Sequence, residues 1–488
     1  MKKIAKRFIA AVSCAAMVIS VVGCGNNKQS TESTKQSVGL TQQSVESTKQ
    51  SEESAKENEK VTKVEVWSHD AHSKTVMNEL VKDWNETRGK EIGLEIVYTV
   101  KEGDIKQAVD MAMISEQAPD FFTSVNVTKY SDSGEIYPIN DLPGGEEMIA
   151  KYDQTVLKST SFKGVDGKIY CLPASVITFG LVYNKDMFKK YGIVDENGEP
   201  TPPKTFEEVR EYAKIMTNEA EQDFGIILPM KWGSFYETDV VQLTWGTAGR
   251  AAFDCVNGVY DYSVYKPVYE MYMGLKEDGS IFPGAESLDN DMARAYFAER
   301  NIGMKFAGSY DVGVFNSQFP AKCDWGVAPY PVEDPDNCYK QYMTAGGHMA
   351  VTTAAVEKLG ADKAMEILEF FYSDELARVL YEEGMALPHD FSIVEDITFK
   401  EGLTGWKEFA ELIGRSTSGF AYGSTELTGE DKHKAVFMNK VWNGTITVDE
   451  AIVELDERYN RGMQTYYKNN PNKKLEDKLI PDWNSKID

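Results

Sequence analysis

Residues 168–206 constrain the fold more than any other stretch, because a buried-strand pattern is followed there by two helix signals. The middle part, 177–183, is β-branched and aromatic, which is typical of a buried strand. A short helix is predicted to follow and to end at Gly192. Thr205 and Glu208 then have the spacing of a capping box, which predicts the start of a second helix. The order strand, helix, loop, helix indicates an α/β protein, and an α/β enzyme could also contain it.

The first 24 residues carry the pattern of a secretion signal followed by a lipid-attachment site. A basic start precedes an apolar run over 8–22, which is too short and wrongly flanked for a permanent membrane span. Val-Val-Gly-Cys at 21–24 resembles a bacterial lipobox, which predicts a lipoprotein signal peptide over 1–23 and lipidation of Cys24. Ordinary signal cleavage beside an incidental Cys24 is the alternative. A lipidated Cys24 predicts a cell-membrane location on the extracytoplasmic face, because more than one acyl chain anchors a protein durably.

Residues 24–60 have the composition of a flexible tether, rich in Ser, Thr, Gln, Lys and Glu. The stretch contains almost no large apolar residue and repeats Ser-Thr-Lys-Gln-Ser at 33–37 and 47–51. No hydrophobic core can form from this composition. Its random-coil reach is roughly 30 Å, so it would let a lipid-anchored domain move while staying attached. A partner-binding tail is the alternative interpretation.

The length and charge of the chain limit its class. At 488 residues it is long enough to bury a large core and to form two domains. The formal charge of −25 becomes −29 when the four positive residues of the first 23 are removed. This charge repels nucleic acid and anionic lipid surfaces, and it disfavours a strongly anionic ligand. We therefore expect no nucleic-acid partner.

Motifs of the common enzyme classes are missing from the sequence. It contains no GxSxG, GxGxxG, P-loop or HExxH pattern, so it predicts no catalytic residue and no cofactor. His69, Asp70 and His72, with His348, would suit a metal only if a Glu or Cys completed the ligand set. None stands at ligand spacing, so we expect His69 and Asp70 to act as hydrogen-bonding groups.

Strands and helices alternate from residue 61 to residue 123. This alternation predicts a doubly wound parallel sheet, in which ligands bind at the carboxyl ends of the strands. Polar residues at these ends, and near the strand over 177–183, are the predicted hydrogen-bonding contacts. They are Ser68, His69, Asp70, Ser124, Asn126 and Thr178.

Aromatic side chains are the other candidates for ligand contact. A neutral sugar offers hydroxyl groups and C–H faces, so its site needs planar rings together with polar side chains. Tyr310 stands out because it follows Gly308 and Ser309 at the end of a predicted strand. For Trp232, Tyr236 and Trp245, each taken alone, a place in the core is the favoured interpretation, and Phe420 and Tyr422 lie in a Gly/Ser/Thr-rich loop that could line the cleft. The aromatic candidates are Trp232, Tyr236, Trp245, Tyr310, Phe420 and Tyr422.

Several passages resemble one protein family. They include LPASVITFGLVYNKDMFKKYGI from residue 172 with PPKTF at 202–206, AYFAERNIGMKFAGSYDVG at 295–313, and WGVAPYP at 325–331. The later passages are KAMEILEFFYSDELARVLYEEGMALP at 363–388 and NGTITVDEAIVELDERY at 443–459. In this order they resemble family-1 extracellular solute-binding proteins, which are maltose-binding-protein-like lipoproteins of ABC sugar importers.

The resemblance implies an α/β fold of the periplasmic-binding-protein type II, with two α/β lobes joined by hinge strands and an interlobe ligand cleft. It implies a hinge near Gly346 and Gly347, and it places Tyr310 where an aromatic residue of the family commonly faces the ligand. Ser124 stands where many relatives have a Trp or a similarly large group, which leaves the pocket width open. The implied boundaries are lobe one at 61–176 and 348–390, lobe two at 178–346 and 395–470, and a C-terminal tail at 471–488.

The implied function is a monomeric, non-enzymatic receptor. It would capture a mono- or oligosaccharide by hinge closure and deliver it to the permease subunits of an ABC transporter. A peptide, a polyamine or a metal chelate remains possible as the solute. A secreted glycoside hydrolase or lyase, and a sensor subunit for a membrane kinase, are alternatives from other classes. Cys323 and Cys338 flank a Pro-rich loop and are compatible with a disulfide or with free thiols.

Overall fold

The computed structural model describes residues 61–487, apart from short gaps. The gaps are 71–72, 102–104, 153, 155, 159–160, 165, 347, 398–401 and 420–422. The predicted signal peptide, the tether, Cys24, His72, Gly347, Phe420 and Tyr422 therefore lie outside the described residues. Within the described ranges, no helix combines the length and apolar character that a membrane span requires.

The first sheet has the strand order β12-β3-β1-β2. Strands β1 (Thr62–Ser68), β2 (Leu94–Val100) and β3 (Phe121–Thr123) run parallel, as the alternation of strands and helices predicts. Strand β12 (Met349–Val351) is antiparallel to β3, so the prediction of a wholly parallel sheet is wrong at this edge. An antiparallel edge strand is common on such sheets, and β12 comes from a part of the chain more than 200 residues after β3.

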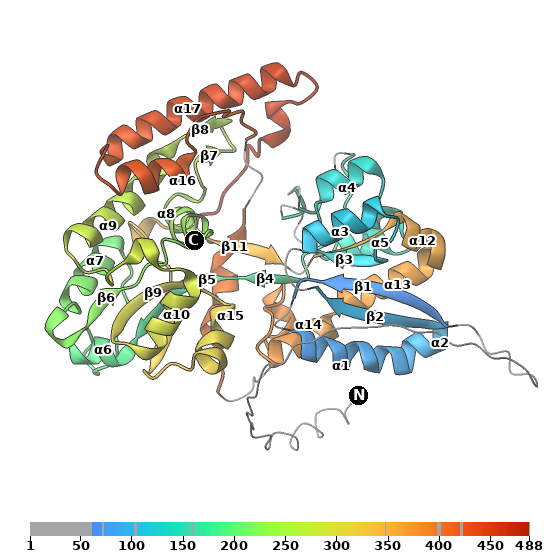
Figure 1. The fold of residues 1–488 in the computed structure, drawn as a ribbon, viewed down its shortest axis with the longest axis horizontal. Helices are drawn as coiled ribbons and strands as arrows, with labels where there is room; N and C mark the ends of the chain where they lie inside the picture. Colours follow the sequence, from blue (N-terminus) through green and yellow to red (C-terminus); the bar gives the residue numbers. More distant parts are fainter. Residues whose placement is uncertain are drawn as a thin grey trace, which may run out of the picture. The chain divides into compact units, whose positions relative to one another are not determined.

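Helices cover this sheet and bury its apolar side chains. Val64 and Val66 alternate with polar residues along β1 and are fully buried. Helices α1 (Lys74–Trp84) and α13 (Ala361–Phe371) supply much of the apolar cluster around the sheet (Figure 1). The other helices of this region are α2 (Lys90–Ile92), α3 (Ile105–Ile114), α4 (Val127–Ser133), α5 (Gly145–Ile149), α12 (Thr353–Leu359) and α14 (Asp374–Glu382).

The second sheet has the order β10-β5-β9-β6 and is mixed. Strand β5 (Phe179–Asn184) is antiparallel to both β10 (Trp325–Pro329) and β9 (Ile302–Gly308). Strand β6 (Phe224–Ile226) is parallel to β9. All seven residues of β9 are buried, as expected for a central strand covered on both faces.

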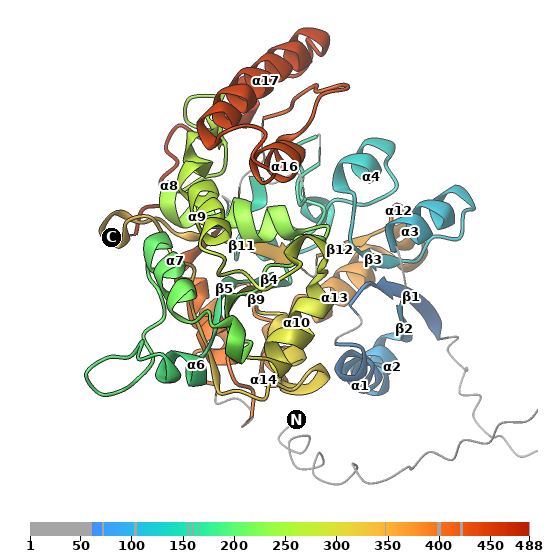
Figure 2. The same ribbon diagram turned by 60° about the vertical axis from the view of Figure 1, so that its left-hand side comes forward.

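Two helices around the second sheet begin at capping boxes, and the box at Thr205 was predicted from the sequence. The Thr205 hydroxyl accepts a hydrogen bond from the Glu208 backbone N–H, and the Glu208 side chain accepts one from the backbone N–H of Thr205, at the start of α7 (Phe206–Ile215). Thr447 and Glu450 form the same box before α17 (Val448–Asn469), which lies beside α16 in both views (Figures 1 and 2). Other elements here are α6 (Lys185–Lys190), α8 (Gln242–Ala248), α9 (Lys266–Glu277), α10 (Asn290–Glu299), α11 (Asp311–Gly313), α15 (Trp406–Glu411), α16 (His433–Val436), β7 (Phe253–Asp254) and β8 (Val259–Tyr260).

A third, three-stranded sheet has the order β13-β11-β4 and carries the chain between the other two. Strand β11 (Gln341–Gly346) pairs with β4 (Ser175–Ile177) and with β13 (Ser416–Ser418). The single strand predicted over 177–183 is therefore divided, because β4 ends at Ile177 and β5 begins at Phe179. Thr178 lies at the break, where its carbonyl accepts a hydrogen bond from Ser309 at 2.9 Å.

The C-terminal part of the chain is more extensively folded than its polar composition indicates. Helix α17 continues through a polar sequence to Asn469. The predicted surface tail is also anchored, because Ile480 donates a backbone hydrogen bond to Cys255 and Ser485 is buried. The four cysteines that the structure describes are free, so the disulfide between Cys323 and Cys338 is not formed.

Three charged side chains, Asp239, Lys305 and Asp311, are buried in the core around the second sheet, and the half-buried Arg294 pairs with Asp311. Asp311 accepts a hydrogen bond from Nε of Arg294 at 2.6 Å, and Nζ of Lys305 lies 3.6 Å from its Oδ2. Asp239 interacts electrostatically with both Lys305 and Asp311. Its Oδ1 accepts a hydrogen bond from the Thr238 hydroxyl at 2.8 Å. No described residue hydrogen-bonds its Oδ2. Burial raises the pKa of Asp239 to about 7.

This elevated pKa predicts a pH-dependent contribution to stability. The folded state retains a proton on Asp239 that the unfolded chain releases, so the wild type should lose unfolding free energy as the pH rises from about 5 to about 8. Asp239→Asn removes the titration, so its stability relative to the wild type should improve over the same range. Urea denaturation of both proteins at each pH measures this difference. A difference that does not change with pH would contradict the prediction.

Candidate ligand-binding pocket

A pocket of about 420 Å³ lies beside the second sheet and the connecting strands. Its walls come from β4, β5, β11, the residue pair after β9, and a continuous helical segment. That segment consists of a π-helical turn, η6 (Tyr236–Val241), followed directly by α8. The lining residues are Ile177, Phe179, Trp232, Ser234, Glu237, Thr238, Val241, Gln242, Trp245, Tyr310, Tyr342 and Thr344.

Three of the predicted aromatic residues, Trp232, Trp245 and Tyr310, meet in this pocket. Tyr310 packs edge-on against Phe179, with ring centroids 6.3 Å apart, and Trp245 lies 5.3 Å from Tyr342. These rings come from four separate parts of the chain. They give the pocket the flat apolar surfaces on which the C–H faces of a sugar can stack.

The position of Tyr310 explains the Gly-Ser-Tyr sequence. The ring folds back over Gly308, so a Cβ atom at that residue would lie 2.5 Å from Cε1 of Tyr310. The guanidinium carbon of Arg294 lies 5.4 Å from the centre of the same ring, a cation–π distance. Because Asp311 holds Arg294, the buried ion pair also supports the aromatic wall.

The polar groups of the pocket are one carboxylate, Glu237, together with an amide, indole N–H groups and hydroxyls. The Gln242 side chain is only 6% exposed, and no described residue hydrogen-bonds its Oε1. Oε1 of Glu237 lies 3.4 Å from Nε2 of His433. Of the described residues that line the pocket, none is a lysine, an arginine or a histidine. The pocket therefore suits a solute that donates hydrogen bonds and carries no negative charge.

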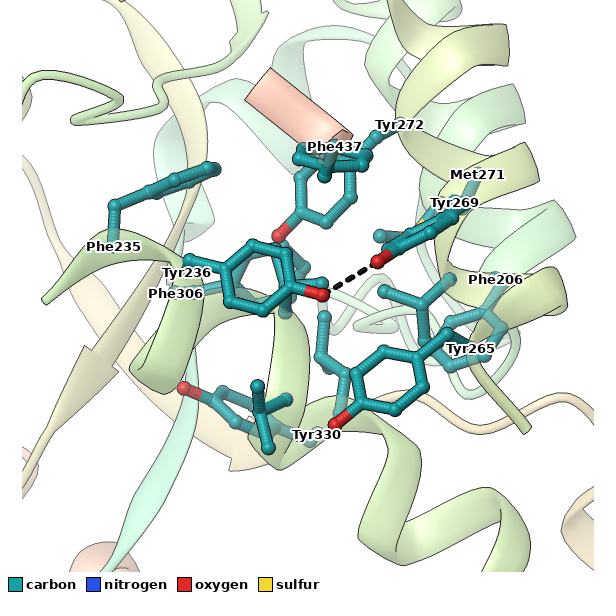
Figure 3. Close-up of a cluster of buried hydrophobic side chains, with 14 of the residues drawn as sticks. Phe206, Phe235, Tyr236, Tyr265, Tyr269, Met271, Tyr272, Phe306, Tyr330 and Phe437 are labelled. Atoms are coloured by element: carbon teal, nitrogen blue, oxygen red, sulfur yellow. Dashed lines mark hydrogen bonds between the residues drawn. The ribbon is translucent and has the colours of Figure 1, made fainter. Parts of the chain in front are cut away.

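Tyr236 does not reach the pocket, although it lies next to the lining residue Glu237. Its side chain is fully buried among other tyrosines, and its hydroxyl is hydrogen-bonded to that of Tyr269 (Figure 3). The His433 ring stacks on it at 4.9 Å. Successive residues of a helical turn point in different directions, which separates Tyr236 from Glu237. The assignment of Tyr236 as a ligand contact is therefore wrong in this geometry.

Thr178 is also directed away from the pocket. Its side chain is fully buried, and its hydroxyl donates a hydrogen bond to the carbonyl of Phe409 at 2.7 Å. This bond fixes the chain where β4 passes into β5, so Thr178 has a structural role. Gly346 ends β11 and pairs with Ser175, at the junction where a hinge was predicted.

The polar residues after β1 form a local network that does not line the pocket. Nδ1 of His69 lies 2.7 Å from Oγ1 of Thr123, and burial lowers the pKa of His69. Oδ2 of Asp70 accepts a hydrogen bond from the Ser73 hydroxyl at 2.8 Å. Oγ of Ser68 accepts one from the Asp70 backbone N–H at 3.1 Å. These bonds close the turn before α1.

The predicted residues after β3 are placed in the same region. Ser124 has a φ of +60°, which is uncommon for a residue with a side chain. Oδ1 of Asn126 accepts a hydrogen bond from the backbone N–H of Lys129 and caps α4.

Burial lowers the pKa of nearby His348 to about 4, with His69 and Lys106 contributing to the shift. In the described parts of the chain, no group of three His, Cys, Asp or Glu residues is arranged to hold a metal ion.

Several lining residues were missed by the sequence analysis, although a signal for them exists. Thr238, Val241 and Gln242 precede Trp245 by seven, four and three residues, so they share one helix face with it. Tyr342 and Thr344 alternate along β11 and therefore share one face of that strand. The helical period, counted back from Trp245, predicts that Thr238, Val241 and Gln242 lie on the same face. Nothing in the sequence places β11 against that helix.

Comparisons with known proteins agree with this fold. A family model described as bacterial extracellular solute-binding protein matches residues 70–378. The maltotriose-binding protein of Pyrococcus abyssi is 26% identical over 242 residues, which are 49% of this chain and 47% of that protein. The chain thus spans about half the length of this curated relative.

Solved structures show the same mixed α/β, two-lobe fold. The GacH receptor of Streptomyces glaucescens has a TM-score of 0.62 and 17% identity, covering 83% of this chain and 98% of the receptor. The cyclic alpha-maltosyl-1,6-maltose binding protein of Arthrobacter globiformis has a TM-score of 0.61 and 18% identity, covering 83% and 99%. From the family match, the chain belongs to the bacterial extracellular solute-binding proteins.

Proposed function

We propose that this protein is the lipid-anchored solute receptor of an ABC importer and that it captures a neutral mono- or oligosaccharide in the 420 Å³ pocket. The observation that carries the proposal is the composition of the pocket walls. Aromatic rings line the pocket together with the buried Gln242, whose Oε1 has no hydrogen-bond partner among the described residues, and no cationic side chain lines the described walls. A sugar hydroxyl can donate a hydrogen bond to this oxygen.

The proposal includes closure of the two lobes around the solute. The pocket is lined partly by Ile177 of β4 and by Tyr342 and Thr344 of β11, and these strands belong to the sheet that carries the chain between the other two. A solute that contacts these strands can favour one arrangement of the lobes over another. The closed receptor would then deliver the sugar to the permease, acting as a monomer and without changing the sugar chemically.

Relatives with solved structures guide the choice of test sugars. RafE has been solved in complex with raffinose, and the domain from Bdellovibrio bacteriovorus was solved bound to maltotriose. Calorimetry of the full-length chain against maltotriose, raffinose, glucose and glucuronate should show binding of at least one neutral sugar and none of glucuronate. The bound sugar should be recovered intact, and small-angle scattering should show a more compact protein. Binding of glucuronate alone, or recovery of a cleaved sugar, would reject the proposal.

The pocket walls predict which substitutions weaken binding. Trp232→Ala and Tyr310→Ala should each reduce the binding free energy by about 1–3 kcal/mol, because each removes an aromatic anchor. Gln242→Leu should also weaken binding, because it removes the buried acceptor while keeping a similar volume. Calorimetry with the sugar that binds the wild type measures these losses.

Matched controls come from α17, which does not line the pocket. Tyr466→Ala removes a half-buried aromatic ring, and Gln464→Leu replaces an exposed glutamine. Both variants should bind with wild-type affinity. Wild-type affinity in all three pocket variants would contradict the assignment of this pocket as the sugar site.

The anchor predicts a simple fractionation result. Cys24→Ala removes the thiol that would carry the lipid, so the variant should leave the membrane fraction of a bacterium that expresses it. The wild type should remain in that fraction and incorporate labelled palmitate. Retention of the variant in washed membranes would contradict lipidation at Cys24.

A further inference from the structure

The last residues of the described chain, 480–487, return to the two elements that form one wall of the pocket. The segment follows a short 3₁₀ turn, η14 (Leu475–Lys478). Three backbone hydrogen bonds attach it: Ile480 N–H donates to the Cys255 carbonyl at 2.8 Å, Lys340 N–H to the Ser485 carbonyl at 2.7 Å, and Ile487 N–H to the Cys338 carbonyl at 3.2 Å. The segment is therefore an ordered part of the fold.

Trp483 connects this segment to α8. Its indole Nε1 donates a hydrogen bond to the carbonyl of Gly249 at 3.0 Å, and the Ser485 hydroxyl donates to the same oxygen at 3.1 Å. Gly249 is the C-terminal cap of α8 and has a φ of +70°. Carbonyl groups at a helix C-terminus lack partners within the helix, so these two donors stabilise the end of α8.

The same indole packs behind a pocket residue. The rings of Trp483 and Trp245 are 6.1 Å apart and nearly perpendicular, at 83°. Trp245 is only 1% exposed and lines the pocket, so the part of its ring that faces away from the pocket is enclosed by protein. Such edge-to-face pairs have a preferred geometry, so one ring restricts the orientation of the other.

The segment also contacts the start of β11. Lys486 forms a β-bridge with Tyr339, and the Tyr339 N–H donates to the Gly246 carbonyl of α8 at 2.8 Å. Tyr342 lies three residues after Tyr339 and lines the pocket together with Thr344, the other lining residue of β11. The segment thus joins α8 and β11 on the side away from the solute.

We propose that residues 480–487 set the orientation of the Trp245 and Tyr342 wall and so determine the affinity and selectivity of the pocket, with Trp483 as the main positioning residue. Trp483 touches no solute in this arrangement and acts through Trp245. That the solute is a sugar rests on the function proposed above, whereas the positioning of the wall is a property of the protein alone and can be tested without ligand.

The first test uses hydrogen–deuterium exchange on the full-length chain without sugar. Trp483→Ala should increase exchange in the peptides that cover α8 and β11, because the end of α8 loses a donor and Trp245 loses a neighbour. Trp483→Phe keeps a ring behind Trp245 and should restore most of the protection. Asp482→Ala changes the exposed neighbouring residue and should exchange like the wild type.

If Trp483→Ala does not fold, Ser485→Ala provides a second variant, because it removes one donor to Gly249 and keeps the indole. Unchanged exchange in α8 and β11 for the folded variants would overturn the proposal. So would an equal increase over the whole protein, since that result indicates general destabilisation.

The second test is a double-mutant cycle with maltotriose as the probe. Trp483→Ala should weaken binding about tenfold in the wild type and have almost no effect in a Trp245→Ala background, since residues that act as a unit are not additive. Equal losses in both backgrounds would overturn the proposal. If the wild type binds neither maltotriose nor another neutral sugar, the sugar assignment fails, and the exchange experiment alone decides whether the segment positions the wall.

Discussion

The pairing of β5 with β9 is the interaction on which the pocket depends. Its register places Phe179 opposite Gly308, so the Tyr310 ring that folds over Gly308 meets the Phe179 ring. A slip of one residue would turn every side chain of β5 to the other face of the sheet. Because β9 is buried on both faces, such a slip would force side chains into packing sites of the wrong shape. The hydrogen bonds of Thr178 fix the same register where β5 begins.

Glu237 is the one charged residue among the described pocket walls, and further charged side chains lie behind the Tyr310 ring. Arg294 lies over Tyr310 and is neutralised by Asp311, while Lys305 is buried beside the same carboxylate. A buried ion pair is a weak source of stability, because desolvation offsets most of the attraction. The ion pair acts here mainly through its geometry. The hydrogen bond from the Arg294 guanidinium to the Asp311 carboxylate fixes the guanidinium, which in turn limits where the Tyr310 ring can lie. The pocket surface itself then offers apolar rings and hydrogen-bond acceptors to the solute.

Much of the local structure was predictable, because short-range patterns control it. The capping box at Thr205 starts a helix where the sequence indicates. The sequence favoured Tyr310 as a ligand contact because it follows a strand end, and it lines the pocket together with Trp232 and Trp245, for which a place in the core was the favoured interpretation. Tyr236 was not distinguishable from them by sequence, because only the packing around Tyr269 shows that it belongs to the core.

The sequence by itself determined the family, the α/β class and most element boundaries, since these depend on composition and on spacing within one segment. Only the tertiary structure decided which polar groups are hydrogen-bonded within the fold and which line the pocket. Oε1 of Gln242 has no hydrogen-bond partner among the described residues, while Thr178 and Asn126 use their side-chain oxygens within the fold. The tertiary structure also brought Trp483 behind Trp245, across more than 200 residues of chain. Contacts of this kind depend on long-range packing, for which a single sequence carries no periodic signal.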